Sequence, residues 1–348
     1  MFRFFSVYKF SKIVILSLCA ISLLCFNSVL LEAKDHTKSV NKAKIHKISK
    51  KIQTPKHKSR IKVSKASRKF KKNGKAIAKG YHVPSPTQTS LIADVLTGEV
   101  LHAENIHHTI YPASLTKMMT LYLVFDELKK NNISMNTQFT VSSHAQNMRP
   151  SKLGLVKGQK LSVQDGIMAL IVKSANDAAV TIAEGIGGSE EKFAILMNKK
   201  AQNLGMTSTN FANASGWHAK NQYTTALDMA KLGLALRRDF PEYYHLFKST
   251  SFVFAGRVVN GHNNVLRQYV GAEGLKTGYT NHARFNLVTT ASKDGKALIG
   301  VVTGHPTASK RDQKMTKLLD TYFDKAAYDE NYHQKSKKPK KKTLFQSA

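Results

Sequence analysis

Cysteine is nearly absent from this sequence of 348 residues: the only two, Cys19 and Cys25, lie in an apolar N-terminal run. The rest of the chain therefore offers no disulfide framework, no cysteine nucleophile and no cysteine-ligated metal site. The 14 histidines include no His-Glu-x-x-His and no other tight ligand spacing, which argues against a metal enzyme. We expect neither a metal nor a cofactor.

Acidic residues are scarce relative to basic ones, and this imbalance is concentrated in two segments. The chain has 54 Lys and Arg against 22 Asp and Glu, a formal charge of +32. Residues 34–80 hold 18 of the basic groups with one acid, and residues 331–348 hold six lysines with none. Residues 81–330 are only mildly basic, with 27 basic and 20 acidic groups. The high charge therefore describes two tails rather than the body of the protein.

Both tails are lysine-rich, and residues 34–80 contain only one aromatic residue, Phe70. Such segments do not bury enough apolar surface to offset their ordering entropy, so we predict a disordered tether at 34–80 and a disordered tail at 331–348. No aromatic or glycine-rich platform accompanies the charge, which argues against nucleic-acid binding. Two interpretations stay open: electrostatic contact with anionic membrane or wall polymer, and a solvated spacer.

The first 33 residues are typical of an export signal. Arg3, Lys9 and Lys12 precede a mostly apolar stretch at 13–31, and Ala33 is a suitable end for a cleavage site. The stretch is also long enough to span a bilayer if it is retained. We favour cleavage over retention as an anchor, and both predict that the body, residues 81–330, is exported as one domain.

Hydrophobic residues make up 42% of the chain, enough for a packed core. Alternation predicts a hairpin at 91–95 and 100–104 and two strands at 285–291 and 297–303, joined by a turn at Asp294-Gly295. A segment that is apolar nearly all round, 115–128, predicts a buried helix. Further helices are predicted at 163–172, 177–183, 189–205, 224–236 and 307–323. One sheet built from both ends, with a helical insertion, satisfies this order.

The segment Ser114-Leu-Thr-Lys117 opens the predicted buried helix. Lys117 lies three residues after Ser114, on the same helix face, and a lysine with a depressed pKa is a suitable base for a serine nucleophile. Ser-x-x-Lys occurs five times in the chain, so the spacing alone is a weak signal. Of the other four, Ser189 is better explained as a helix N-cap.

Two further segments strengthen this hypothesis. Ser174 and Asn176 lie at a break between two predicted helices, where a hydroxyl and an amide can face a cleft. Lys276-Thr277-Gly278 precedes the first C-terminal strand and adds a second cation, a hydroxyl and a glycine that permits close approach to the backbone. Ser-x-x-Lys, Ser-x-Asn and Lys-Thr-Gly in this order are typical of penicillin-binding proteins and class A β-lactamases.

The chain resembles the low-molecular-weight penicillin-binding proteins, which are serine-type D-alanyl-D-alanine carboxypeptidases. The resemblance covers roughly residues 88–323. It is carried by the segments 94–100, 111–117, 150–154, 173–177, 197–198, 213–216 and 276–280. It implies an α/β (α+β) fold of the serine β-lactamase/DD-peptidase type, with an antiparallel sheet flanked by helices and a mostly helical insertion. It also implies a place in the periplasm or on the outer face of the cytoplasmic membrane.

The resemblance implies removal of the terminal D-Ala from peptidoglycan stem pentapeptides, which limits cross-linking, and acylation by β-lactams. Ser114 would attack the carbonyl of the penultimate D-Ala, and Lys117 would take its proton. Ser174 and Asn176 would relay a proton to the leaving amine and hold the substrate amide. Lys276 would help to keep Lys117 neutral.

The remaining implied contacts are to the substrate. The backbone N–H groups of Ser114 and Tyr279 would form the oxyanion hole. The residues expected to bind substrate are Lys276, Thr277, Gly278, Tyr279, Thr280 and Arg311.

The sequence departs from the family pattern in three places. Arg284 stands where glycine is common, and Trp217 stands where a smaller apolar residue is usual. We expect Trp217 to pack in the core. Many members also have a β-rich domain and an anchor helix after the catalytic domain, whereas about 25 lysine-rich residues follow the last predicted helix here.

Three other functions are weighed against the sequence motifs. A β-lactamase is disfavoured because no Glu-x-x-Leu-Asn follows Asn176 and the middle motif is Ser-Ala-Asn. A wall-binding protein with a dead site is disfavoured because all the catalytic residue types are intact. A DD-endopeptidase that cuts peptidoglycan cross-links stays open, because the same residues would catalyse that reaction.

Overall fold

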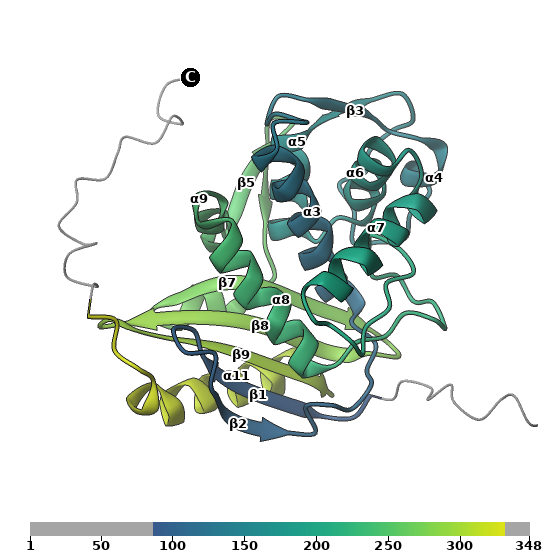
Figure 1. The fold of residues 1–348 in the computed structure, drawn as a ribbon. Helices are drawn as coiled ribbons and strands as arrows, with labels where there is room; N and C mark the ends of the chain where they lie inside the picture. The colour runs from purple at the N-terminus through teal and green to yellow at the C-terminus, as the bar shows by residue number, and fades with distance from the viewer. Residues whose placement is uncertain (1–85, 331–348) are drawn as a thin grey trace, which may run out of the picture. The chain divides into compact units, whose positions relative to one another are not determined.

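The main sheet joins strands from both ends of the described region. The computed structural model describes residues 86–330 (Figure 1). Its five strands are antiparallel, in the order β2-β1-β9-β8-β7. They comprise β1 (Thr89–Asp94), β2 (Val100–Glu104), β7 (Ala272–Thr280), β8 (Arg284–Lys293) and β9 (Lys296–His305). Because β1 pairs with β9, the predicted sheet from both chain ends is confirmed.

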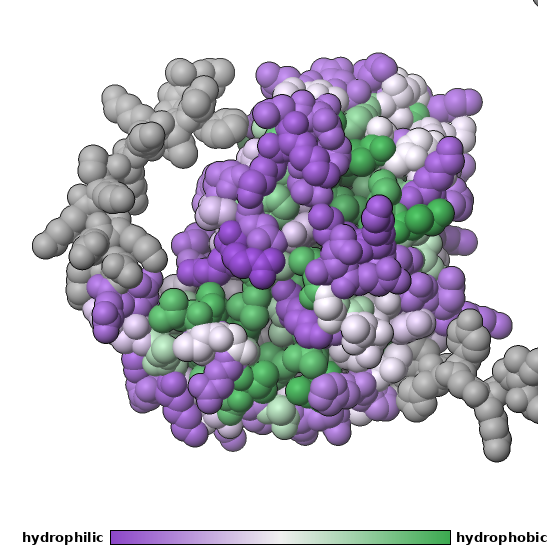
Figure 2. All heavy atoms as spheres, viewed as in Figure 1, coloured by the Kyte–Doolittle hydropathy of each residue, from purple (hydrophilic) through white to green (hydrophobic). Residues whose placement is uncertain are grey.

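Both faces of this sheet are buried, and alternate residues of each strand serve different cores. Leu91 and Val288 belong to the core that contains α8 (Ala226–Asp239). Their chain neighbours Ile92 and Leu287 belong to the core that contains α11 (Ala308–Tyr322). The period of two along a strand therefore places one helix on each face. Figure 2 shows hydrophilic residues over most of one side of the molecule, with hydrophobic ones gathered in its lower part and in a strip higher up.

The helical insertion lies between β2 and β7 and surrounds one buried helix (Figure 1). That helix, α3 (Lys117–Lys129), is buried nearly all round, as its sequence predicts. It packs against α6 (Asn176–Gly187), α7 (Glu190–Asn203) and α8, and the insertion also contains α4 (Ser143–Gln146) and α5 (Val163–Met168). Short elements complete the insertion: α9 (Pro241–Tyr244), α10 (Asn264–Gln268) and the hairpins β3–β4 (Gln138–Thr140, Lys160–Ser162) and β5–β6 (Ser251–Phe254, Arg257–Asn260).

Most predicted helices are confirmed. They were predictable because the residues that cap them are close in the sequence. The Ser162 and Ser189 side chains accept hydrogen bonds from the N–H groups of Asp165 and Lys192, as N-caps do. One predicted helix changes its type along its length. The helix expected at 163–172 is α-helical only to Met168 and continues as a π-turn at Ala169–Lys173. No described helix has both the length and the apolar character needed to cross a bilayer. The predicted signal, tether and tail lie outside the described residues.

Arg284 begins β8 with a left-handed backbone, φ 58°. A residue with a Cβ pays about 1–2 kcal/mol for this conformation, which explains why the family pattern has glycine here. We expect Arg284→Gly to raise the melting temperature by about 2 °C, the net of relieved strain and a more flexible unfolded chain. Arg284→Ala loses the same charge but keeps the strain. An equal gain in Arg284→Ala, measured by thermal unfolding, would contradict this account.

Candidate active site

Ser114 lies in a 3-10 turn, Ala113–Thr116, that leads directly into α3. The sequence placed Ser114 at the start of the helix, and the α-helix begins one turn later, at Lys117. Ala113 has a left-handed backbone with φ 49°, although it is not glycine. Strained conformations of this kind persist where the surrounding structure fixes them, and they cluster at functional sites.

The Lys117 amine is completely buried and contacts the Ser114 hydroxyl, with Nζ 3.1 Å from Oγ. Nζ also donates to Asn176 Oδ1 at 2.7 Å and to the Ser215 carbonyl at 2.5 Å. A neutral amine has two N–H donors and one lone pair. With both donors used by Asn176 and Ser215, the lone pair faces Ser114 and can accept its proton.

The charge environment favours this neutral form. Burial lowers the pKa of Lys117 well below its ordinary 10.5, and the nearby Lys276 cation lowers it further. The carboxylates of Asp177 and Glu190 act in the opposite direction and are smaller effects. A desolvated lysine beside a second cation matches the activation predicted from the sequence.

Ser174 ends the π-turn before α6 with a left-handed backbone, φ 60°. Its side chain is almost fully buried, yet among residues 86–330 its Oγ has no hydrogen-bond partner. A buried hydroxyl without a partner is costly, and its position in the cleft is available to a substrate.

Asn176 makes more hydrogen bonds within the protein than the sequence suggested. Its Oδ1 accepts from Lys117, and its Nδ2 donates to the Arg149 carbonyl at 2.8 Å. Its backbone N–H donates to the Ser151 carbonyl at 2.7 Å. Asn176 therefore links the segment at 149–151 to the base.

The Lys-Thr-Gly segment was expected to precede the first C-terminal strand, and this was wrong: it lies within β7, the edge strand of the sheet. Lys276 is buried, and its Nζ donates to the Thr277 carbonyl at 3.0 Å. Burial, followed by the Arg311 charge, lowers the pKa of Lys276 to about 7. The second cation is thus in place, and its charge is sensitive to pH near neutrality.

Gly278 lets β7 lie against the Ser114 turn. A Cβ at this position would lie 3.0 Å from the Pro112 carbonyl oxygen and 3.3 Å from the Ser114 nitrogen. A side chain would therefore force the strand away from the turn. The close approach predicted for this glycine is made by the chain's own backbone.

A cleft of about 290 Å³ opens where these segments meet. Among residues 86–330, no acidic residue lines it. The predicted site residues that line it are Ser114, Ser174, Asn176, Thr277, Gly278, Tyr279, Thr280 and Arg311. Lys117 and Lys276 lie beneath this lining, buried. In the part of the chain that the structure describes, no group of three His, Cys, Asp or Glu side chains is arranged to hold a metal ion.

Arg311 lies on α11, yet it is only 3% exposed and faces the cleft. Its guanidinium pairs with Asp312 at 2.7 Å. Thr280 is partly used by the fold, because its Oγ1 accepts from the N–H of Ala283 at 3.0 Å. Arg311, although paired with Asp312, and Thr277 are the guanidinium and the hydroxyl that the lining offers to a substrate carboxylate.

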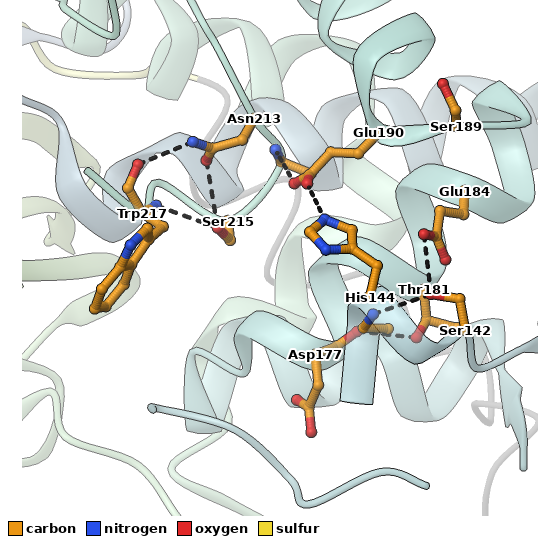
Figure 3. A network of polar contacts seen from close by, with 12 residues as sticks. Ser142, His144, Asp177, Thr181, Glu184, Ser189, Glu190, Asn213, Ser215 and Trp217 are labelled. Atoms are coloured by element: carbon orange, nitrogen blue, oxygen red, sulfur yellow. Dashed lines mark hydrogen bonds and ion pairs between the residues drawn. The ribbon is translucent and has the colours of Figure 1, made fainter. Parts of the chain in front are cut away.

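Trp217 does not pack in the core, contrary to expectation. It is 44% exposed and lines the cleft beside Gly216. Its backbone N–H donates to Ser215 Oγ at 3.1 Å, and its carbonyl accepts from Asn213 Nδ2 at 2.9 Å. These bonds fix the loop (Figure 3), and Trp217 is part of the cleft lining.

The loop at 213–217 also touches the nucleophile turn. A Cβ on Gly216, whose φ is 81°, would lie 1.9 Å from the Ala113 carbonyl oxygen. The sequence marked this segment only as part of the family pattern. Its function in the fold is to bring the Ser215 carbonyl to Lys117.

Asp177 is a positioning residue that sequence reasoning missed. Its buried carboxylate accepts from the backbone N–H groups of Leu153, Gly154 and Leu155 at 2.8–3.0 Å. These bonds hold the loop that precedes β4 against the start of α6. The only signal in the sequence was an acid directly after Ser-Ala-Asn.

Glu190 is a second positioning residue that was missed (Figure 3). Its Oε1 accepts from the Ala214 N–H at 3.0 Å, and its Oε2 contacts His144 Nε2 at 2.8 Å. Glu190 thus fixes the residue before Ser215. From the sequence, it was indistinguishable from an acid in the first turn of any helix.

Comparison with known proteins agrees with this geometry. The family model described as D-alanyl-D-alanine carboxypeptidase matches residues 78–307. The D-alanyl-D-alanine carboxypeptidase DacF of Bacillus subtilis is 35% identical over 260 residues, which cover 73% of this chain and 65% of the relative. DacC of Escherichia coli is 37% identical over 240 residues, 67% of this chain and 60% of the relative. The chain thus spans less than two thirds of these curated relatives.

Solved structures give the same fold. Penicillin-binding protein 5 from Haemophilus influenzae superposes with a TM-score of 0.66 at 36% identity, over 70% of this chain and 72% of that one. Penicillin-binding protein D2 from Listeria monocytogenes, in its ampicillin-bound form, gives 0.62 at 29% identity, over 69% of this chain and 97% of that one. The predicted fold class is confirmed.

Proposed function

The chain belongs to the D-alanyl-D-alanine carboxypeptidase family, and we propose that it is a serine D-Ala-D-Ala carboxypeptidase that removes the terminal D-Ala from peptidoglycan stem peptides. The observation that carries the proposal is the buried Lys117 amine, 3.1 Å from Ser114 Oγ, with its two other contacts both to acceptors. That arrangement supplies a nucleophile and its base in one cleft.

In the proposed reaction, Ser114 Oγ attacks the carbonyl carbon of the penultimate D-Ala and passes its proton to Lys117 Nζ. The backbone N–H groups of Ser114 and Tyr279 stabilise the resulting oxyanion. The C–N bond then breaks, and the leaving amine receives a proton from Lys117 through Ser174, whose Oγ has no hydrogen-bond partner among the described residues. Water hydrolyses the acyl-enzyme and releases the shortened peptide.

The terminal carboxylate of the substrate is proposed to bind Thr277 and Arg311, with Lys276 and Thr280 beside it. The cleft suits an anion because its lining contains a buried arginine and, in the described part of the chain, no acid. β-Lactams carry a comparable carboxylate and would acylate the same serine. The N-terminal segment supports export, so we place the reaction outside the cytoplasm.

Release of D-alanine from a soluble N-acylated Lys-D-Ala-D-Ala peptide tests the proposal. We expect release from this peptide and little from the same peptide with a C-terminal amide, because the amide lacks the carboxylate. A cross-linked peptide dimer serves as the third substrate. Cleavage of the dimer alone would replace the carboxypeptidase assignment with an endopeptidase, and cleavage of none by folded protein would refute both.

The pH dependence tests the roles of Lys276 and Arg311. If protonated Lys276 helps to hold the substrate, kcat/KM falls as pH rises through about 7, the pKa of Lys276 in the free protein. Arg311 is one cause of that low pKa, so Arg311→Gln should move this limb of the profile to higher pH. The exposed Arg238 gives a matched control, Arg238→Gln. If the pH at which kcat/KM falls is unchanged in Arg311→Gln, titration of Lys276 is not the cause of that fall.

A further inference from the structure

A second, larger groove adjoins the catalytic cleft. It measures about 810 Å³ and lies between the loop around Lys152 and the β5–β6 hairpin. His262 and its neighbourhood connect the two, because His262 lines both the groove and the cleft. A substrate that is bound in the cleft and extends toward His262 therefore also contacts this groove.

The groove carries positive side-chain charge that no neighbouring carboxylate balances. Three cations, Lys152, Lys173 and Arg257, line it together with His262, and among residues 86–330 no acid does. None of the four has a carboxylate partner within residues 86–330. Some lysines on other surfaces of the described residues, by contrast, pair with carboxylates.

Three examples show the contrast: Lys130, Lys200 and Lys314 each lie within 3.1 Å of a carboxylate. Unpaired cations gathered in one concave surface raise the local concentration of anions. The groove therefore differs from a solvated face on which charges of both signs mix.

The positive potential extends to the catalytic residues. The pKa of His262 is lowered by burial first and then by Lys173, Lys276 and Arg267. His262 thus responds both to a groove cation, Lys173, and to the catalytic Lys276. Apolar atoms are also present, since Phe254 and the 67% exposed Val258 line the hairpin side. An aliphatic chain that ends in an anion fits both features.

We propose that this groove is an anionic subsite that binds a second carboxylate of the peptidoglycan peptide, distinct from the carboxylate of the terminal D-Ala. The inference rests on the proposed function, because it assumes that the cleft holds a D-Ala-D-Ala peptide. The carboxylate has two possible sources in such a peptide: a side chain on the acyl-donor side, and a group on the leaving side. Both would place an anion among Lys173, Arg257 and His262.

Two matched pairs of peptides separate these sources. In the first pair, the residue before D-Ala-D-Ala carries either a side-chain carboxylate or the corresponding carboxamide. In the second pair, the leaving residue carries either group. The full chain is used, and kcat/KM is measured for each peptide. We expect the carboxylate peptide to be favoured about fivefold to tenfold in one pair, and we expect added salt to narrow that preference.

Arg257→Gln is the main variant because Arg257 begins strand β6 of the hairpin, whereas Lys173 is the chain neighbour of Ser174. We expect it to reduce the carboxylate-to-amide ratio toward one, and Lys173→Gln to do the same. Lys199→Gln removes the same charge from the exposed side of α7 and is expected to leave the ratio unchanged.

A measurement of peptide binding tests the subsite independently of the proposed function. The Ser114→Ala variant is titrated with the same peptides by calorimetry, with and without Arg257→Gln. A carboxylate preference that Arg257→Gln removes supports the subsite even if no D-alanine is released. Equal affinities for carboxylate and amide in both pairs, or a preference that survives Arg257→Gln and Lys173→Gln, would overturn it.

Discussion

Ser114→Ala is expected to abolish D-alanine release and the covalent capture of penicillin, with a loss of about 10⁴-fold or more in kcat. The reason is that no other hydroxyl contacts the Lys117 amine: among the described residues, its partners are Ser114 Oγ, Asn176 Oδ1 and the Ser215 carbonyl. Intact-protein mass spectrometry after incubation with penicillin measures the acyl-enzyme directly, and D-alanine release measures turnover.

Ser189→Ala is the matched control, because Ser189 also begins a Ser-x-x-Lys sequence. Its side chain caps α7 through the Lys192 N–H. The control should cost about 1 kcal/mol of stability, the ordinary price of a lost N-cap, and should still form the acyl-enzyme. A penicillin adduct that persists in Ser114→Ala would show that another residue is the nucleophile.

The Ser114 variant should remain folded, which makes its inactivity interpretable. The serine is only partly buried, and its hydroxyl has Lys117 as its one side-chain partner among residues 86–330. Loss of one such hydrogen bond costs about 1 kcal/mol. A melting temperature close to that of the original protein is therefore expected.

The parts of this site that the sequence predicted depend on short-range patterns. Ser114 and Lys117 are three residues apart on a helical turn, so their contact follows from helix geometry. The hairpin turn at Asp294 and Gly295 is equally local, and both residues have positive φ. The caps by Ser162 and Ser189 need only the next few residues.

The parts that the sequence missed or left open depend on long-range packing. The strand character of β7 arises from its pairing with β8, and its glycines weakened the local signal. Arg311 seemed as suited to a helix surface as to a cleft, and its burial depends on β8 lying alongside. Trp217 is aromatic and was expected inside, but the hydrogen bonds of its loop turn it toward the cleft.

Lys117→Met is expected to lower the rate of acylation by about 10³-fold, the scale of losing a general base. Methionine is apolar and of similar length, so it fills the space but cannot accept the Ser114 proton. The loss should appear in penicillin acylation and D-alanine release alike. A small loss in both would mean that another group accepts the proton.

The same variant tests whether Lys117 is neutral in the folded protein. An unfolded lysine is protonated below its ordinary pKa of 10.5, whereas burial holds the folded Lys117 pKa well below that value. Between the folded pKa and 10.5, the unfolded state binds one more proton, so the free energy of unfolding rises with pH. Lys276 makes a similar contribution, between about 7 and 10.5, in both proteins.

Denaturant unfolding of both proteins between about pH 7 and pH 10 isolates the Lys117 contribution as a difference. The original chain should gain stability relative to Lys117→Met by up to about 1.4 kcal/mol per pH unit, the linkage of one proton. Lys129→Met, which removes an exposed ammonium from the end of the same helix, should show no such slope. A flat difference for Lys117→Met would mean that the folded protein keeps Lys117 charged. A charged amine has no lone pair for the Ser114 proton, so the base would then have to be sought elsewhere in the cleft.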